Sequence, residues 1–574
     1  MRRTGFRGLL AALALSASAL SMMSAAQAAD AAPELAVTLK PAAADAAGTV
    51  PYVDVTVTIP AVKAVAGAPL LRMPLVTNNV KSVADTLSDL TASDAAGPLT
   101  LVSTDDADKP VMAYRHWTAD RPVDGTVTVR YRAPITTLAN PRGAAPPLEL
   151  RTDGGAFSGA TETFLILPEA ATPYRLALHW DLGAGAAGIS SLGAGDVTSA
   201  DLLKPEALGA TYVMGGNIHR YPEVTPRQGF FSAWQGDPPF DGRALMQWTE
   251  SLYHHYLGYF KTAGAPPYGV FLRPNLVNAG GGVELNGSFI GTYDQKTRVE
   301  DFKFTLAHEM VHTFIQSLDA PAGLAGSWFT EGIAVYYQNR LPLRAGQITN
   351  DEFLRDLNTT VARYYTNILN TAPNSAIPER FWADTRIRVL PYDRGAIYFA
   401  LVDGEVRKAS HGRRSLDDLI LAMLDRRHQG KPMDQAAWVE TITRELGERG
   451  GQEFQAMLDG ALIVLDDDAF GSCFTRTTVP LRRYQLGFDP EVLIQPKRII
   501  HGLIPGSAAA EAGVRDGDEI VKPVPQDILQ GDQKATLTLQ IRRDGQVFPV
   551  TYLPRGETVP TYQWALKPGK AACK

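Results

Sequence analysis

The sequence HEMVH at positions 308–312 most constrains the fold, because its two histidines can readily serve one metal ion only if the segment is helical. Residues four apart lie on the same face of an α-helix, so both imidazoles can then face one point. Glu331 follows nineteen positions after the second histidine, inside an apolar run over residues 328–337 that also has helical character. The pattern therefore predicts two helices that face each other at these residues.

The chemistry predicted by this pattern is a zinc centre with one ion per chain. His308, His312 and Glu331 would be three protein ligands, and the fourth position of a tetrahedral ion would stay open, as it does at catalytic sites. Glu309 stands next to the first ligand, where it can act as a general base on a water molecule. A solvated helix that matches the motif by chance is the alternative for the pentapeptide alone. The second helix-like run favours the metal site.

The first 28 residues have the pattern of a signal peptide. Three arginines precede an apolar run, and Ala26-Gln27-Ala28 offers a small-residue cleavage site. The apolar run is short for a membrane span, and no later stretch reaches about 18 apolar residues. We therefore expect no stable membrane insertion after removal of the signal and a periplasmic or secreted mature protein. A retained membrane anchor is the alternative.

Length and charge limit the possible classes of protein. A chain of 574 residues exceeds one compact core and predicts about three domains. The formal net charge is −6 and no basic cluster occurs, which argues against nucleic-acid binding. The two cysteines, Cys473 and Cys573, could form one disulfide in an oxidising compartment, or both could be free thiols.

Changes in hydrophobic pattern divide the mature chain into three regions. Residues 29–200 alternate apolar and polar positions, as at Val53, Val55 and Val57, and predict an antiparallel β-sandwich-like domain. Residues 201–475 predict a mainly helical catalytic domain with one strand at 268–272. Its expected helices cover residues 243–261, 300–318, 328–337, 351–368, 393–406 and 415–423. Residues 476–574 are rich in predicted strands. The fold class is thus multidomain α+β.

Two further segments carry candidate site residues. Gly281 and Gly282 precede Glu284, and such glycines let an extended backbone lie close to a ligand. The carboxylate of Glu284 could hold the free amino end of a substrate, although a surface glutamate after a glycine-rich hairpin is the alternative. Tyr392 stands at the start of a predicted helix, where its hydroxyl could stabilise an oxyanion or simply pack against its neighbours.

The C-terminal region resembles a PDZ domain. Gly513, Gly517 and Asp518 match the family's spacing of a short helix, a Gly-Asp turn and a strand. The carboxylate-binding loop of that family would fall at Leu486-Gly487-Phe488, where backbone N–H groups could receive the C-terminus of a peptide. A module that only packs on its neighbour is an equal alternative.

Together and in this order, the motifs resemble the glycyl aminopeptidase family of gluzincins, metallopeptidase family sixty-one. The resemblance implies a β-rich N-terminal domain, a thermolysin-like catalytic domain and a PDZ domain. It also implies zinc ligation by the two histidines and Glu331, with Glu309 as general base, Tyr392 as oxyanion donor and Glu284 as amine anchor. Two positions depart from the family pattern: Leu285 stands where the family has histidine, and Arg394 replaces a lysine.

The predicted function is therefore a zinc aminopeptidase that acts on small N-terminal residues, Gly or Ala, of peptides with a free N-terminus. A zinc endopeptidase of the same fold is one alternative, in which Glu284 is merely structural. A non-catalytic PDZ peptide-binding protein with a vestigial site is the other.

Overall fold

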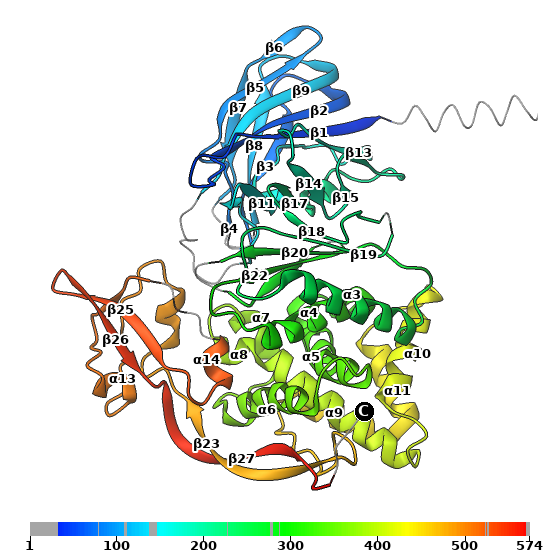
Figure 1. The fold of residues 1–574 in the computed structure, drawn as a ribbon, viewed down its shortest axis with the longest axis vertical. Helices are drawn as coiled ribbons and strands as arrows, with labels where there is room; N and C mark the ends of the chain where they lie inside the picture. Colours follow the sequence, from blue (N-terminus) through cyan, green and yellow to red (C-terminus); the bar gives the residue numbers. More distant parts are fainter. Residues whose placement is uncertain are drawn as a thin grey trace, which may run out of the picture. The chain divides into compact units, whose positions relative to one another are not determined.

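The structure is a computed structural model that describes residues 33–569, apart from positions 79, 108–111, 137–145, 227, 276–278, 286, 523 and 525–526. The predicted signal segment and Cys573 lie outside the described residues. The chain divides into two compact units, one formed by Met1–Thr137 and Leu148–Ile218 and the other by Leu138–Pro147 and His219–Lys574 (Figure 1). Over the described ranges, the search for a helix of sufficient length and hydrophobicity to span a membrane found none.

The first unit is built from three β-sheets. A seven-stranded sheet has the order β16 (Val197–Thr198), β13 (Arg175–Trp180), β1 (Glu34–Pro41), β2 (Tyr52–Ala64), β9 (Val123–Pro134), β5 (Ser88–Asp94), β6 (Gly97–Leu99). A second sheet has the order β12 (Leu167–Pro168), β3 (Pro69–Thr77), β8 (Met112–Ala119), β7 (Leu101–Asp105), with β4 (Val80–Lys81) on β3. The third has the order β10 (Arg151–Asp153), β11 (Ala156–Ala160), β17 (Tyr212–Gly216), β14 (Ala187–Ser190), β15 (Gly193–Ala194).

The alternation predicted for this region is visible in β2, where Val53, Val55 and Val57 are buried and the residues between them are partly exposed. The unit ends at Ile218 rather than at the predicted boundary of residue 200. The reason is strand pairing: β17 lies between β11 and β14 and hydrogen-bonds to both, so the segment after residue 200, which also holds the short helix α2 (Glu206–Gly209), belongs to this unit.

A five-stranded sheet opens the second unit. Its order is β18 (His219–Tyr221), β19 (Phe230–Trp234), β20 (Tyr268–Pro274), β22 (Ser288–Tyr293), β21 (Gly282–Leu285). The central strands β19, β20 and β22 are parallel, and β21 is an antiparallel strand at the edge. Every residue of β22 is buried, as expected for a central strand that is covered on both faces.

Helices form most of the rest of this unit. They are α3 (Gly242–Tyr259), α4 (Val299–Phe314), α5 (Ser327–Arg344), α6 (Asn350–Thr366), α7 (Ile377–Arg380), α8 (Thr385–Arg388), α9 (Leu390–Ala409), α10 (Leu416–His428), α11 (Gln435–Leu446), α12 (Glu448–Leu458). All six helices expected from the sequence are present, with ends shifted by a few residues and with α5 extending beyond the run at 328–337. The helices α7, α8, α11 and α12 were not predicted. One large apolar core joins α3, α4, α5, α6 and α9 to the sheet.

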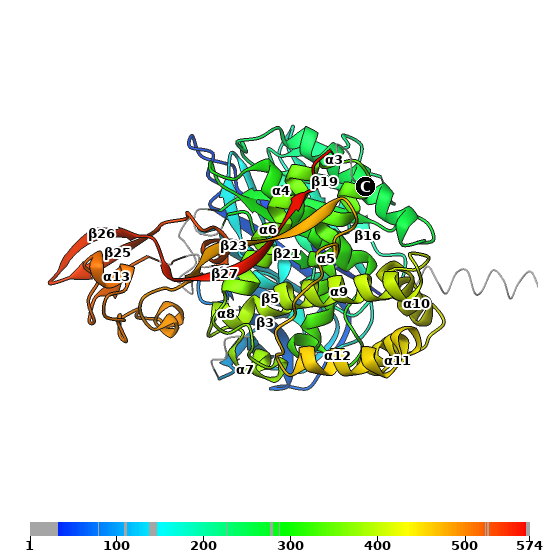
Figure 2. The same cartoon turned by 90° about the horizontal axis from the view of Figure 1, so that it is seen from below.

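The C-terminal segment forms a small β-rich domain with an apolar core of its own. It consists of β23 (Phe474–Tyr484), α13 (Ala508–Glu511), β24 (Glu519–Ile520), α14 (Asp527–Gly531), β25 (Leu537–Arg543), β26 (Gln546–Tyr552) and β27 (Arg555–Leu566). The long antiparallel ribbon of β23 and β27 crosses α6 (Figure 2). There the Asn358 side chain donates to the carbonyl of Trp564 and accepts from its N–H, both at 2.8 Å. The predicted boundary at residue 475 therefore falls inside β23 and separates no compact units.

Candidate active site

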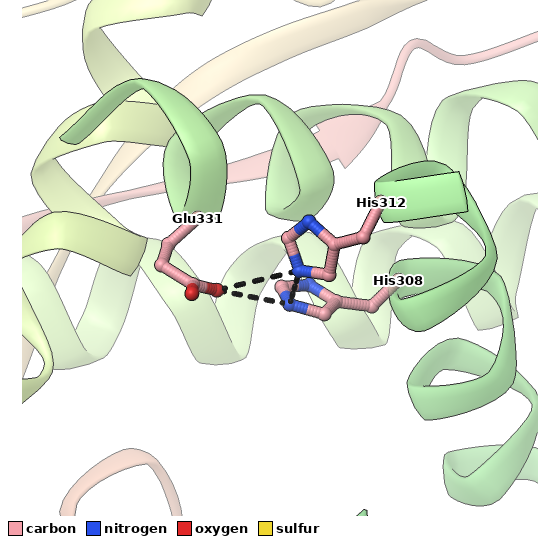
Figure 3. Close-up of side chains that lie close together, drawn as sticks. All are labelled: His308, His312 and Glu331. Carbon is pink, nitrogen blue, oxygen red and sulfur yellow. Dashed lines mark hydrogen bonds and ion pairs between the residues drawn. The ribbon is translucent and has the colours of Figure 1, made fainter. Parts of the chain in front are cut away.

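Helices α4 and α5 bring the three predicted ligands together. Nε2 of His308 lies 3.3 Å from Nε2 of His312, and the Oε2 atom of Glu331 lies 3.3 Å and 3.6 Å from these two nitrogens (Figure 3). The histidines come from successive turns of α4, and the glutamate faces them from the first turns of α5. The predicted convergence of two helices at these residues is therefore observed.

The spacing of these atoms suits a tetrahedral divalent ion. Zinc–nitrogen bonds of about 2.0–2.1 Å at tetrahedral angles place two ligand atoms about 3.3–3.4 Å apart. The two imidazole nitrogens stand 3.3 Å apart, and both lie within 3.6 Å of the carboxylate oxygen. Two imidazole nitrogens and one carboxylate are also a donor set that zinc commonly takes at catalytic centres. The residues present thus fit the ion that the sequence predicted.

A hydrogen-bonded chain behind the first histidine sets its tautomer. Nδ1 of His308 lies 3.0 Å from Oε1 of Gln338, and the amide NH₂ of Gln338 donates to both carboxylate oxygens of Asp356 at 3.1 Å and 2.9 Å. Because the carboxylate accepts only, the Gln338 amide must turn its oxygen to the histidine. Nδ1 of His308 then carries the proton, and Nε2 keeps its lone pair for a metal.

The crossing of α5 and α9 positions the predicted oxyanion donor. A Cβ atom on Gly332 would lie 2.6 Å from the Cα atom of Gly395, so only glycines allow these helices to approach so closely. The fully buried Asp393 fixes the first turn of α9 by a bidentate ion pair with Arg363, at 2.5 Å and 2.7 Å. As a result the Tyr392 ring stacks beside the His308 ring, with 6.0 Å between the centroids.

A cavity of about 490 Å³ joins the candidate residues. Its lining includes the following members of the predicted site: Gly282, Glu284, Glu309, His312, Glu331 and Tyr392. Gln316 also lines it, and no sequence motif pointed to that residue. The arrangement places a buried carboxylate, a hydroxyl and a carboxylate on an edge strand around one space next to the potential metal ligands.

The edge strand β21 supplies the glycines and Glu284. A Cβ atom on Gly282 would meet the Phe289 ring at 2.2 Å, so a glycine is required for β21 to lie against β22. Gly281 does not line the cavity; its carbonyl accepts from the N–H and the hydroxyl of Thr292, at 2.9 Å and 3.0 Å. The glycines therefore allow the strand to take this place, and Glu284 is its charged residue that lines the cavity.

Burial changes the proton affinity of two carboxylates here. It raises the pKa of Glu309 above the ordinary value of a glutamate, even though the neighbouring histidines lower it. Desolvation by the surrounding protein atoms also raises the pKa of Glu284 to about 7, and His312 partly opposes this shift. Part of the Glu284 side chain stays exposed to solvent, so a cationic group placed next to it would favour its charged form.

The two departures from the family pattern lie away from the reacting groups. Neither Leu285 nor Arg394 lines the cavity. Arg394 is buried and donates to the carbonyl of Ala372 and the side chain of Asn374, both at 2.5 Å, so it anchors the segment before α7. Burial lowers the pKa of this arginine to about 10. Its exchange for lysine would alter that segment rather than the site.

The predicted carboxylate loop Leu486-Gly487-Phe488 belongs to the C-terminal domain and does not line the cavity. Gly487 has a φ of +95°, and a Cβ atom there would meet the side chain of Ala509 at 2.6 Å. Within the described residues, no acceptor is found for the N–H groups of the three loop residues. The loop thus presents consecutive donors on a backbone that requires glycine at its centre.

Part of the chain matches the model of a known protein family. Residues 302–372, which run from α4 into the loop after α6, match the family described as M61 glycyl aminopeptidase. This confirms the resemblance predicted from the motifs for that segment and supports a metallopeptidase. No curated protein matches the chain.

Solved structures show the fold. The aminopeptidase N family protein of Idiomarina loihiensis superposes with a TM-score of 0.64 and 14% identity over 93% of this chain and 98% of that chain. The chain thus has the multidomain mixed α/β fold of that protein. The M1 zinc metallopeptidase of Deinococcus radiodurans matches with a TM-score of 0.45 and 16% identity over 76% of this chain and 95% of that one. Native yeast LTA4 hydrolase matches with a TM-score of 0.43 and 12% identity over 75% of this chain and 67% of that one.

Proposed function

We propose that this protein is a zinc-dependent aminopeptidase that removes small residues, Gly or Ala, from peptides with a free N-terminus. The observation that carries the proposal is the convergence of three potential zinc ligands, with interatomic distances of 3.3–3.6 Å, on a cavity that also holds Glu309, Tyr392 and Glu284. The preference for small residues follows from the family match rather than from the cavity.

His308, His312 and Glu331 would hold the zinc ion. Zinc, when bound, polarises a carbonyl and lowers the pKa of water towards about 7. Glu309 accepts a proton from the water molecule that attacks the scissile carbonyl, because its carboxylate lines the cavity next to the ligands and burial raises its pKa, which makes it a better base. When the C–N bond breaks, the same carboxyl group returns the proton to the departing amine.

Tyr392 and Glu284 act on two groups of the substrate's first residue, its carbonyl and its free amine. The Tyr392 hydroxyl donates a hydrogen bond to the oxygen that becomes negative as the water attacks, which stabilises charge present only along the reaction path. Glu284 binds the substrate's ammonium group by a charge-assisted hydrogen bond. An amine held by Glu284, which lines the same cavity from the edge strand, limits how much chain can lie before the scissile bond.

A peptide and its N-acetylated form test this assignment against an endopeptidase. The aminopeptidase should release the first residue of the free peptide only, and a chelator should abolish the release. Glu284→Gln should lower kcat/KM for the free peptide by about 10-fold or more, because one charged hydrogen bond of about 1.5–3 kcal/mol is lost. Equal cleavage of both peptides at internal bonds would show an endopeptidase. Purified, folded protein that binds no zinc would favour the non-catalytic alternative.

A second proposed activity concerns the C-terminal domain, which we assign as PDZ-like. Its support is the set of three consecutive N–H donors without a described acceptor at Leu486, Gly487 and Phe488. Such donors can receive a peptide's terminal carboxylate. A peptide library with free C-termini should contain binders that lose affinity when amidated. If amidation has no effect on any binder, the domain serves packing alone.

Export of the mature protein to the periplasm or the medium completes the proposal. Cys473 is disulfide-bonded, which fits an oxidising compartment, and its predicted partner Cys573 lies outside the described residues. N-terminal sequencing of protein from fractionated cells should find cleavage after residue 28. Uncleaved protein confined to the cytoplasm would contradict the assignment.

A further inference from the structure

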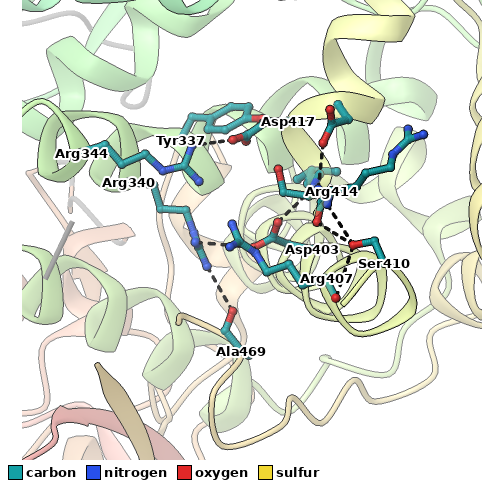
Figure 4. A network of polar contacts seen from close by, with 12 residues as sticks. Tyr337, Arg340, Arg344, Asp403, Arg407, Ser410, Arg414, Asp417 and Ala469 are labelled. Atoms are coloured by element: carbon teal, nitrogen blue, oxygen red, sulfur yellow. Dashed lines mark hydrogen bonds and ion pairs between the residues drawn. The ribbon is translucent and has the colours of Figure 1, made fainter. Parts of the chain in front are cut away.

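A second cavity, of about 330 Å³, lies in the catalytic unit and shares no lining residue with the first. Its walls come from α5, α6, α9, α10, the loop between α9 and α10, and residues 470–474, which lead into β23. Figure 4 shows the polar contacts of four of its arginines, Arg340, Arg344, Arg407 and Arg414. The volume is within the range of small-molecule sites. The proposed peptidase mechanism does not use it.

The lining of this cavity is strongly basic although the whole chain carries a net charge of −6. Five arginines line it: Arg340, Arg344, Arg407, Arg413 and Arg414. Only two carboxylates do so, Asp417 and Asp418. Counting also the outside carboxylates that pair with these arginines, Asp403 and Glu445, still leaves the arginines in excess.

Two of the arginines that line the cavity form close ion pairs with carboxylates. Arg344 contacts Asp417 at 2.7 Å, and Arg414 contacts Glu445 at 3.0 Å. The second lining carboxylate, Asp418, caps the start of α10 by accepting from the Ser415 N–H at 2.9 Å. It therefore adds negative charge to the lining without pairing with a guanidinium.

Arg340 and Arg413 have guanidinium N–H groups that can bind a further acceptor. The Arg340 side chain is 9% exposed and forms a long ion pair with Asp403 at 3.8 Å, while Asp403 binds Arg407 more closely at 2.9 Å. The rings of Tyr336 and Phe470 lie over the Arg340 guanidinium, 4.4 Å and 5.1 Å from its central carbon. Its hydrogen bond goes to the carbonyl of Ala469, at 3.3 Å. A guanidinium carries five N–H donors, so these contacts leave Arg340 with donors for a further acceptor.

Arg413 has no carboxylate within 4.0 Å in the part of the chain that the structure describes. Its Nε donates to the carbonyl of Ser410 at 3.0 Å, and the residue is exposed to solvent. The rings of Phe353, Phe470 and Phe474 complete the wall. The cavity therefore combines fork-shaped cationic donors with an apolar side.

We propose that this cavity binds a compact oxyanion of two or more negative charges, with phosphate as the recognised group. Guanidinium groups match such oxygens by paired hydrogen bonds, and a dianion would supply a charged partner for Arg413 and a further acceptor for Arg340. The phosphate could be free or an ester, with the phenylalanine rings contacting the organic part. A bound ion would join α5 and α9 to the segment that leads into β23 and so stabilise the fold.

Thermal unfolding and calorimetric titration of the full-length protein test this site. Inorganic phosphate and phenyl phosphate are compared with sodium chloride at equal ionic strength. We expect a saturable rise in melting temperature of about 1–3 °C that chloride does not produce. A response to phosphate itself indicates the free ion, and a response to phenyl phosphate alone indicates an ester. A response no larger than that of chloride would overturn the proposal.

Variants locate the binding. Arg413→Gln changes an exposed residue and should weaken phosphate binding at least about 10-fold. Arg340→Met should do the same, whereas Arg444→Gln, which removes an exposed arginine paired with Glu440 on α11, should leave binding unchanged. Phosphate bound at the candidate metal ligands would be indifferent to Arg413→Gln. Equal affinity in all three variants would therefore refute the site.

Discussion

Replacement of Gln338 by leucine should weaken zinc binding although Gln338 is not a ligand. In the native protein its amide oxygen lies 3.0 Å from Nδ1 of His308, and its NH₂ group is held by Asp356. Leucine removes the acceptor, so the N–H group at Nδ1 of the buried His308 loses its hydrogen-bond partner. The imidazole can then move the proton to Nε2, the atom that should bind the ion.

The expected magnitude follows from that lost hydrogen bond. An unsatisfied buried polar group costs about 1–3 kcal/mol, which corresponds to roughly 5- to 150-fold in affinity. Loss of a hydrogen-bond partner behind a metal-binding histidine typically costs about 10- to 100-fold. Both values predict a zinc dissociation constant about 10- to 100-fold larger in Gln338→Leu. Asp356→Asn should cost less, because an asparagine oxygen can still accept from the Gln338 amide.

Competition against a chromogenic chelator measures this constant on metal-free protein, and circular dichroism checks that each variant is folded. Gln455→Leu is the matched control, because it removes an exposed glutamine of α12 that also donates to an aspartate, Asp459 at 3.0 Å. Zinc affinity within twofold of the native value in Gln338→Leu, or an equal loss in the control, would refute the argument.

Three further outcomes are expected. Tyr392→Phe should lower kcat by about 10²- to 10³-fold with little change in KM, measured by steady-state kinetics on a short peptide. Because burial raises the pKa of Glu284 to about 7, kcat/KM for peptides with a free amine should increase as pH rises through that value and Glu284 ionises, and Glu284→Gln should lose this increase. Burial disfavours the charge of Asp403, but Arg340 and Arg407 outweigh it and lower its pKa. Its stabilisation is therefore complete above about pH 4 and lost as pH falls through the lowered pKa. Urea unfolding at pH 7 should find Asp403→Asn less stable by about 3–5 kcal/mol.

The sequence predicted the parts of the site that follow helical periodicity or local motifs. The two histidines of α4 share a face because they are four residues apart, and the apolar run around Glu331 marked the second helix. Glu284 and Tyr392 were singled out by their neighbours in sequence, and both line the cavity with Glu309.

Other features depend on tertiary packing and left no local signal. The chain from His308 through Gln338 to Asp356 joins three helices, and nothing in the sequence indicates which polar side chains meet. Helix α12 contains Gly450 and Gly451, which disfavour helix, and it forms because Phe454 and Met457 enter the large core. The residues of β17 lie beyond the predicted domain boundary because strand pairing, not composition, decides that boundary.

Zinc content and peptide cleavage measured together on Glu309→Gln test the central claim most directly. Glu309 lies beside the ligands without being one of them, so the variant should retain one zinc per chain and lose about 10²- to 10⁴-fold in kcat for release of an N-terminal glycine or alanine. Native kcat in the zinc-loaded variant would contradict the assignment of Glu309 as the general base and with it the proposed peptidase site.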